Sequence, residues 1–417
     1  MIIKRRGAGA MLLLLILFII SAFGLLSLKN GEIDYMALIM AAATVVIVLI
    51  QYNVMGHVFK NMDRFVVLVA DLLWCIGIIV IYRIDPSFAY KQLVCIVIGI
   101  IGSFVAIAVI RRAENFGKWN YFFAALTVVL LLLPLAFGRT TYGAKNWIDI
   151  GGFFSFQPSE FAKILFIIVS AYVFETRDKI ISFIPYLGYA AISVIVLVVS
   201  KDLGAALLIC GTFLIMFFGA TGRWVLTLLG MGVAGAGAYA SYKLFAHVRT
   251  RVEVWQDPWS SYYDQGYQIV QGLMALASGG LLGVGLGLGA PQTIPARHTD
   301  YIFAVICEDF GIVFGIMLIC FYVIFVVRGI LIALNAGSKF DALLVFGCTS
   351  MLTIQSFIII GGVIKLIPLT GITLPFVRYG GSSMLASMIQ LGIIEGVAIK
   401  NGDRDEEELL EAGGEIL

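Results

Sequence analysis

The residues from Ile294 to Asp309, IPARHTDYIFAVICED, set charged side chains directly before and inside a hydrophobic run. His298, Thr299 and Asp300 precede the apolar residues, and Glu308 follows two turns later. A carboxylate at the edge of a membrane span is costly unless it is solvated, paired or used in chemistry. Asp300 is therefore a candidate for a chemical role. The structural alternative is that Thr299 caps the following helix and Asp300 favours its N-terminus.

A second charged motif, QPSEFAK, opens another hydrophobic run at Gln157. Glu160 and Lys163 are three residues apart, so on a helix they share one face and partly neutralise each other. Charges within membrane spans indicate function by default. An ion pair that only orients the helix is the structural alternative.

Lys201 and Asp202 interrupt a long apolar stretch. A stretch of that length requires a break, so a turn at the membrane surface is one interpretation. A turn does not need an aspartate beside a lysine, and a functional interpretation therefore stays open as well.

The segment from Phe245 to Asp300 is the long polar stretch of the chain and carries Arg249 and Arg251. These arginines could meet lipid phosphates, or they could bind a diphosphate, for which the guanidinium fork is well shaped. Its glycine-rich part, GVGLGLGAP, has no preceding strand, so it predicts flexible backbone and no nucleotide site. The same segment predicts an amphipathic helix in the membrane interface, with an apolar face made of Ile269, Val270, Leu273, Met274 and Ala277.

The sequence YGGSS, from Tyr379 to Ser383, lies in the last apolar run. Small residues allow helices to pack closely, and their hydroxyls can bond to neighbouring helices. Packing is the favoured interpretation of Ser382 and Ser383.

Composition indicates an all-α polytopic membrane protein, because 61% of the 417 residues are hydrophobic and 13% are charged. Repeated apolar runs predict about twelve transmembrane helices. The net charge of +2 gives no argument for binding nucleic acid, and the six cysteines, all in apolar runs, are expected to be packing residues. The expected spans are residues 11–28, 34–50, 65–82, 92–110, 119–137, 158–174, 183–200, 203–218, 224–244, 301–327, 342–364 and 372–399.

Basic residues in the short loops predict that both termini are cytoplasmic. The loops 138–157 and 245–300 are then extracytoplasmic. An even number of spans also leaves an acidic tail, residues 400–417, in the cytoplasm. The tail, acidic from Asp403 to Glu415, is expected to be solvated and partly disordered.

Six motifs in this order resemble the SEDS family (shape, elongation, division and sporulation proteins, including RodA, FtsW and SpoVE). They are Gly143-Ala144-x-x-Trp147-Ile148, QPSE-x-x-K, DLG, the loop with Arg249, Arg251 and Gly-Tyr-Gln, HTDYIFA and YGGSS. The resemblance spans about residues 65–399 and implies that these residues form a catalytic core of ten helices. Residues 1–64 would then be two additional N-terminal helices with a cytoplasmic loop. The usual family residues are replaced at four positions, Asn146, Lys201, Asp309 and Arg378.

The resemblance implies a peptidoglycan glycosyltransferase of the bacterial cytoplasmic membrane that acts in cell elongation, division or sporulation. It implies lipid II as substrate, undecaprenyl diphosphate as product, a class B penicillin-binding protein (a transpeptidase) as partner and a divalent cation, Mg or Mn, with no organic cofactor. It identifies Asp300 as the catalytic residue. The expected substrate-binding residues are Glu160, Lys163, Trp147, Asp202, Arg249, Arg251, His298, Thr299, Tyr379, Ser382 and Ser383.

A β-linked product made from an α-linked donor requires inversion, hence a single displacement with a general base, which we assign to Asp300. Arg249, Arg251 and Lys163 are candidates to hold the leaving diphosphate. Two alternatives stay open. The charged residues could line the path of a lipid II flippase, or the chain could be a catalytically weak scaffold that recruits a transpeptidase.

Overall fold

The computed structural model describes residues 2–28, 33–112, 116–141, 144–150, 154–176 and 183–414. Gly143 of the Trp147 motif and the tail residue Glu415 lie outside the described residues. The α-helices are α1 (Ile2–Ser27), α2 (Tyr35–Val58), α3 (Arg64–Ile84), α4 (Pro86–Arg112), α5 (Asn120–Phe137), α6 (Pro158–Thr176), α7 (Ile184–Val199), α8 (Leu203–Thr221), α9 (Trp224–Leu244), α10 (Ala246–Gln256), α11 (Tyr267–Gly279), α12 (Ile302–Phe310), α13 (Ile312–Leu334), α14 (Lys339–Val363) and α15 (Gly381–Gly414).

Within the described residues, ten of these helices are long and apolar enough to cross a membrane. They are α1 to α5, α8, α9, α13, α14 and α15. The polytopic helical fold is confirmed, whereas about twelve spans were expected. The other two expected spans are also helices, but α6 carries Glu160, Lys163 and Glu175, and α7 has only 16 residues.

The chain folds into two compact units. Unit 1 consists of Met1–Ile100, His247–Phe325 and Ser356–Gly380, and unit 2 of Ile101–Ala246, Val326–Gln355 and Gly381–Leu417. The catalytic candidate Asp300 belongs to unit 1. The Glu160–Lys163 motif belongs to unit 2.

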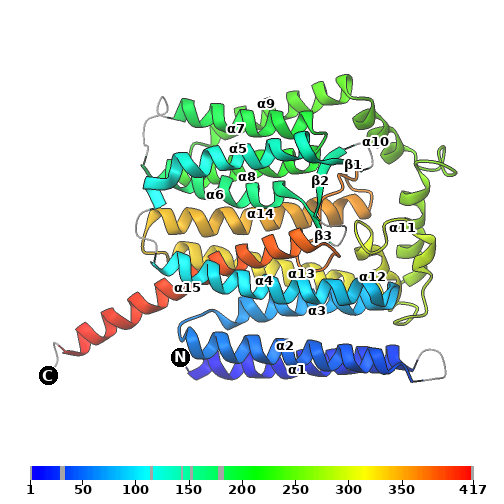
Figure 1. Ribbon diagram of the computed structural model, residues 1–417, viewed down its shortest axis with the longest axis horizontal. Coiled ribbons are helices and arrows are strands. Elements are labelled where there is room, and N and C mark those ends of the chain that lie inside the picture. Colours follow the sequence, from blue (N-terminus) through cyan, green and yellow to red (C-terminus); the bar gives the residue numbers. More distant parts are fainter. Residues whose placement is uncertain are drawn as a thin grey trace. The chain divides into compact units, whose positions relative to one another are not determined.

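In unit 1, α3 is apolar on all sides and buried along most of its length, as expected for a helix surrounded by other helices. The two N-terminal helices α1 and α2 pack against each other and against α3 (Figure 1). Asp34 caps α2 and also accepts a hydrogen bond of 2.8 Å from the Tyr82 hydroxyl of α3. The additional helices are therefore joined to α3 by a polar contact as well as by packing.

Two expected spans differ from the structure. The helix expected over 301–327 is broken at Gly311, which has φ +87° and separates α12 from α13. A Cβ there would overlap backbone atoms of residues 281–283, so the break depends on a close approach that only glycine permits. The span expected over 372–399 begins only at Gly381, because residues 365–380 are irregular and Gly371 and Phe376 have positive φ.

The helix expected in the membrane interface forms as α11, but with a different buried face. Ile269, Val270 and Ala275 are buried, whereas Met274 is exposed. This face packs on α12, where a Cβ at Gly272 would overlap the ring of Tyr301. Helix α11 thus covers the helix that follows Asp300.

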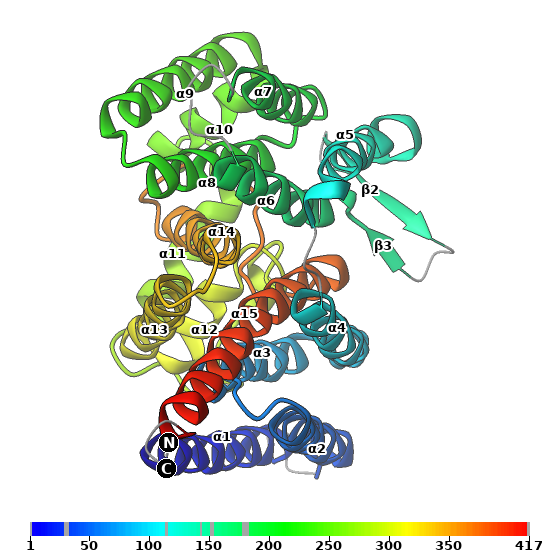
Figure 2. The same cartoon turned by 90° about the vertical axis from the view of Figure 1, so that its left-hand side faces the viewer.

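In unit 2, α5 to α8 share a buried core that includes Leu131, Ala162, Phe166, Leu197 and Ile209. Three short strands, β1 (Arg139–Thr141), β2 (Ala144–Ile150) and β3 (Phe154–Phe156), form an antiparallel sheet in the order β1-β2-β3. Figure 2 shows β2 and β3 beside α5. The all-α prediction did not include this sheet, which lies in the loop 138–157.

The acidic tail is helical as far as Gly414, because α15 continues through it (Figure 1). Arg404 lies 3.6 Å from Glu408 one turn later and donates a hydrogen bond to the Asn335 carbonyl. Pairs spaced by four residues stabilise an exposed helix. The expectation of a partly disordered tail is wrong for the described residues up to Gly414.

Candidate active site

Asp300 lies in a turn immediately before α12 and does not cap it. The N-cap of α12 is Tyr301, without a side-chain cap hydrogen bond. The Thr299 hydroxyl donates to the Ala296 carbonyl instead, at 3.1 Å. Neither side chain caps α12, so the capping part of the structural alternative is wrong. A favourable effect of the Asp300 charge on the N-terminus of α12 stays a prediction.

The nearest cation to the Asp300 carboxylate among the described ion pairs is the Arg378 guanidinium. Oδ1 of Asp300 lies 3.5 Å from Nη1 of Arg378, and the two side chains are 20% and 11% exposed. The carboxylate is thus partly desolvated yet still accessible. A weakly screened charge of this kind interacts more strongly with a ligand than a fully solvated one does.

His298 is packed between aromatic rings beside this pair. Its ring stacks on Phe88 of α4 with 4.6 Å between centroids and meets the ring of Tyr379 edge-on at 5.8 Å. Burial, and then the charges of Arg297 and Arg378, lower the pKa of His298. The imidazole is consequently neutral at pH 7.

The segment 365–380, which carries Arg378 and Tyr379, is held by side chains from two other parts of unit 1. Gln92 of α4 donates to the Arg378 carbonyl at 3.2 Å and accepts from the Gly380 amide at 3.1 Å. Arg251 of α10 donates to the Thr370 carbonyl at 3.0 Å. Arg251, expected to bind substrate, thus contacts the segment that faces Asp300. Arg249 is exposed.

Glu308 and Asp309 are buried at the end of α12, where the glycine-rich loop surrounds them. Asp309 is paired with Arg83 at 2.9 Å, and Glu308 accepts a hydrogen bond of 3.0 Å from the Ala290 amide. A Cβ at Gly289 would lie 2.7 Å from the Glu308 carboxyl carbon. Glycine is needed in this loop because its backbone approaches two carboxylates closely, which is a more specific role than the flexibility expected from its sequence.

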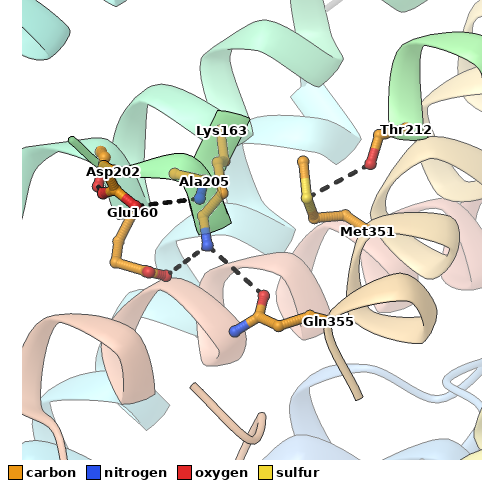
Figure 3. Close-up of polar contacts among 8 residues, drawn as sticks. Glu160, Lys163, Asp202, Ala205, Thr212, Met351 and Gln355 are labelled. Atoms are coloured by element: carbon orange, nitrogen blue, oxygen red, sulfur yellow. Dashed lines mark hydrogen bonds and ion pairs between the residues drawn. The ribbon is translucent and has the colours of Figure 1, made fainter. Parts of the chain in front are cut away.

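In unit 2, Glu160 and Lys163 form a buried ion pair at the start of α6 (Figure 3). Nζ of Lys163 lies 2.9 Å from Oε2 of Glu160 and 3.5 Å from Oε1 of Gln355 on α14. The side chains of Lys163 and Glu160 are only 1% and 7% exposed. The expected pairing on one helix face is confirmed, and Gln355 is a partner that the local motif could not reveal.

Asp202 caps α8, because its Oδ1 accepts a hydrogen bond of 3.0 Å from the Ala205 amide (Figure 3). The Ser159 hydroxyl donates to the other carboxylate oxygen of Asp202, Oδ2, at 3.5 Å. Burial raises the pKa of Asp202. Lys201 adopts φ +62° in the turn. The turn itself is confirmed, whereas its position at the membrane surface and a role of Asp202 in binding substrate stay predictions.

The other expected binding residues occupy unit 2. Trp147 is half-buried in β2, where its backbone pairs with Arg139 of β1. Ser382 and Ser383 are buried in the first turn of α15, as the packing interpretation expects. Among the described residues, no group of three or more His, Cys, Asp or Glu side chains is arranged to hold a metal ion. The expected divalent cation stays a prediction, without an assigned ligand set in this part of the chain.

The roles of Phe88, Gln92, Gln355 and Arg378 were missed from the sequence. The two glutamines carry a recognisable signal, since each is a lone amide within an apolar run and such groups need partners when buried. The stacking of Phe88 carries no such signal. Arg378 stood out as an unusual residue before Tyr379, without an indication of its partner.

The chain is similar in sequence to a family of bacterial proteins. The family model FtsW/RodA/SpoVE, described as cell cycle protein, matches residues 63–402. The peptidoglycan glycosyltransferase RodA of Mycobacterium tuberculosis is 34% identical over 392 residues, which cover 85% of this chain and 83% of that protein. The stage V sporulation protein E of Bacillus subtilis is 33% identical over 361 residues, which cover 81% of this chain and 96% of that protein.

Two solved structures share the fold. One belongs to a study of the structural coordination of polymerization and crosslinking by a peptidoglycan synthase complex; it matches with a TM-score of 0.70 and 26% identity over 82% of this chain and 98% of that one. The crystal structure of the rod shape determining protein RodA of Thermus thermophilus matches with a TM-score of 0.62 and 26% identity, over 81% of this chain and 96% of that one.

Proposed function

The chain belongs to the FtsW/RodA/SpoVE family, the SEDS peptidoglycan glycosyltransferases, and from this premise we propose that it polymerises lipid II into glycan strands at the outer face of the bacterial cytoplasmic membrane. One relative is a sporulation protein by name, one solved structure is of a rod shape determining protein, and the family model is described as cell cycle protein. On this basis we infer that the chain serves cell elongation, division or sporulation. The helices that can cross a membrane support a multi-pass membrane enzyme. The basic residues of the short loops support cytoplasmic termini.

The reaction is an inverting single displacement with Asp300 as general base. The 4-hydroxyl of the acceptor N-acetylglucosamine gives its proton to the Asp300 carboxylate while its oxygen attacks the anomeric carbon of the donor. The bond from that carbon to the diphosphate breaks in the same step, and undecaprenyl diphosphate leaves. A sugar hydroxyl is a poor nucleophile, so the base must lie within about 3 Å of it.

The observation that carries this assignment is the state of the Asp300 side chain. It caps no helix, it is partly desolvated, and an arginine lies 3.5 Å away on a segment that other side chains hold in place. A carboxylate that capped α12 would bond to its first amides. The geometry favours a carboxylate that is kept ready to accept a proton.

The leaving diphosphate requires positive charge. Arg249 is exposed and can reach a ligand, whereas Lys163 is buried against Glu160 and Gln355, so that it would need to exchange a partner to bind one. A divalent cation, when bound, would neutralise charge on the diphosphate. A class B penicillin-binding transpeptidase is the proposed partner, which the similarity to a chain from a peptidoglycan synthase complex supports.

The experiment that tests this function uses the purified full-length chain in proteoliposomes with fluorescent lipid II. The glycosyltransferase should convert lipid II into long glycan strands, resolved on a gel, with and without a cognate transpeptidase. Movement of labelled lipid II across the bilayer without any polymer would instead support the flippase. A chain that does neither, alone or with its transpeptidase, would be the scaffold.

A further inference from the structure

Arg378 is a charged residue that faces the proposed base and is not among the residues expected to bind substrate. Its guanidinium lies 3.5 Å from the Asp300 carboxylate and its side chain is 11% exposed. Arginine is always protonated and presents five N–H donors in a planar fork. One contact of this length occupies a small part of that capacity.

The backbone around Arg378 is fixed on both sides. Its amide donates to the Leu374 carbonyl at 3.2 Å, and its carbonyl accepts from Gln92 at 3.2 Å. The next amide, that of Tyr379, donates to the His298 carbonyl at 3.1 Å. The guanidinium is therefore presented from a rigid point beside the turn that carries Asp300, which reduces the entropy lost when it binds a ligand.

The guanidinium also has unused donors. Nε of Arg378 is buried and has no hydrogen-bond partner in the described part of the chain. A buried donor without a partner is costly, so a ligand with acceptor oxygens would be favoured at this position.

We propose that Arg378 binds the diphosphate of the lipid-linked donor through its unused guanidinium nitrogens while the nitrogen near Asp300 keeps the base in place. This inference rests on the proposed function, which supplies the diphosphate. A diphosphate offers several charged oxygens, and arginine binds such groups in a bidentate manner. Arg378 would thus connect the base and the leaving group of one displacement. The binding residue is contributed by the segment 365–380, just before the YGGSS motif.

A diphosphate contact of this kind has two kinetic consequences. It contributes to binding of the donor before the reaction, so its loss raises KM for lipid II. It also stabilises the charge that grows on the diphosphate as the bond breaks, so its loss lowers kcat. Inhibition by the product, undecaprenyl diphosphate, should weaken together with KM. A residue that only supported packing would not change product inhibition selectively.

The test measures binding to the purified full-length chain in a zwitterionic detergent, with inorganic pyrophosphate and undecaprenyl diphosphate as probes. Arg378→Gln should bind both at least about tenfold to a hundredfold more weakly, because that is the loss expected for a single charge-assisted hydrogen bond and a bidentate contact has two. Arg378→Lys, which keeps the charge, should recover part of the affinity. Arg297→Gln is the matched control, because it removes an arginine whose guanidinium bonds to the Gln292 carbonyl, and its affinity should stay close to that of the wild type.

Phosphatidylglycerol distinguishes the donor diphosphate from a phospholipid headgroup. If Arg378→Gln loses affinity for phosphatidylglycerol as strongly as for the two probes, the site binds headgroups and the inference is overturned. Equal probe affinities in wild type and Arg378→Gln, at equal unfolding midpoints, overturn it as well. An Arg378-dependent diphosphate site in a wild-type protein that makes no glycan would support the inference and reject the proposed function. Normal polymerisation by Arg378→Gln with unchanged KM and product inhibition would reject only the inference.

Discussion

Replacing Lys163 by methionine is expected to leave Glu160 as an uncompensated charge inside unit 2. The two charged atoms are 2.9 Å apart, and with an effective dielectric constant of about 20 Coulomb's law gives an attraction of about 6 kcal/mol. The hydration that both ions lose on burial offsets much of this attraction. Removal of one partner from a buried pair destabilises a protein by about 3–5 kcal/mol, because the other charge stays buried. We expect a loss in that range for Lys163→Met.

The double variant Glu160→Gln/Lys163→Met removes both charges and should recover most of this loss. Replacing a buried pair by groups of similar volume is often close to neutral. The pair Arg111–Asp403 is a matched control, because its N–O distance is also 2.9 Å but its side chains are 38% and 39% exposed. Arg111→Met should change the free energy of unfolding by less than about 1 kcal/mol, since water screens exposed pairs.

The assay is reversible unfolding of the purified variants in mixed micelles, combined with polymerisation of lipid II. An equal free energy of unfolding in Lys163→Met and in the double variant would refute the reasoning. It would mean that the uncompensated charge of Glu160 does not destabilise the single variant. The activity of the double variant separates two roles of the pair. Recovered polymerisation means that the pair acts through the structure of α6, whereas lost activity in a stable protein means that at least one of the two charged side chains contacts the substrate.

Two further outcomes are expected in unit 1. Burial and nearby arginines lower the pKa of His298 in the folded chain. As the pH falls below about 6.5, the imidazole therefore takes up a proton in the unfolded chain before it does so in the folded chain. The contribution of His298 to the free energy of unfolding is thus present above that pH and is lost below it. Between about pH 7.5 and pH 5 the unfolding midpoint of His298→Gln should therefore drop less than that of the wild type; an equal drop would assign the effect to other groups. Gly77→Ala should lower stability by more than about 1 kcal/mol and reduce polymerisation, because its Cβ would overlap the backbone of Val377 in the segment that carries Arg378. Gly24→Ala, whose Cβ has no atom within 4 Å, should stabilise by up to about 1 kcal/mol, and similar effects of the two alanines would contradict the packing argument.

Long apolar helices were predictable from the sequence because their signal is local. The span expected over 224–244 coincides with α9, and the one over 65–82 lies within α3. The break at Gly311 was not predictable, since many glycines occur in apolar runs and this one is distinguished by the backbone of residues 281–283, which comes from another part of the chain. The sheet β1-β2-β3 was missed because two of its strands have only three residues.

The candidate site was predictable as a set of residues and not as an arrangement. The Glu160–Lys163 pair follows from helical spacing alone. The partner of Asp300 does not, because Arg378 is distant in sequence and is brought near it by Gln92 and the His298 backbone. Local rules also allowed Thr299 to cap the following helix, and the tertiary structure does not use that cap. Contacts between distant segments thus decide which polar residues remain free for chemistry.

Polymerisation of lipid II by Asp300→Asn, compared with Asp264→Asn, tests the role of Asp300 most directly. Both changes replace a carboxylate by an amide of the same size in the segment 245–300, and Asp264 is exposed. Asparagine cannot accept the proton of a sugar hydroxyl, so Asp300→Asn should make no glycan strands. It should stay folded, with an unfolding midpoint lowered only by the loss of the 3.5 Å contact with Arg378. Asp264→Asn should polymerise normally. Full-length strands made by Asp300→Asn at the wild-type rate would contradict the assignment of Asp300 as the general base.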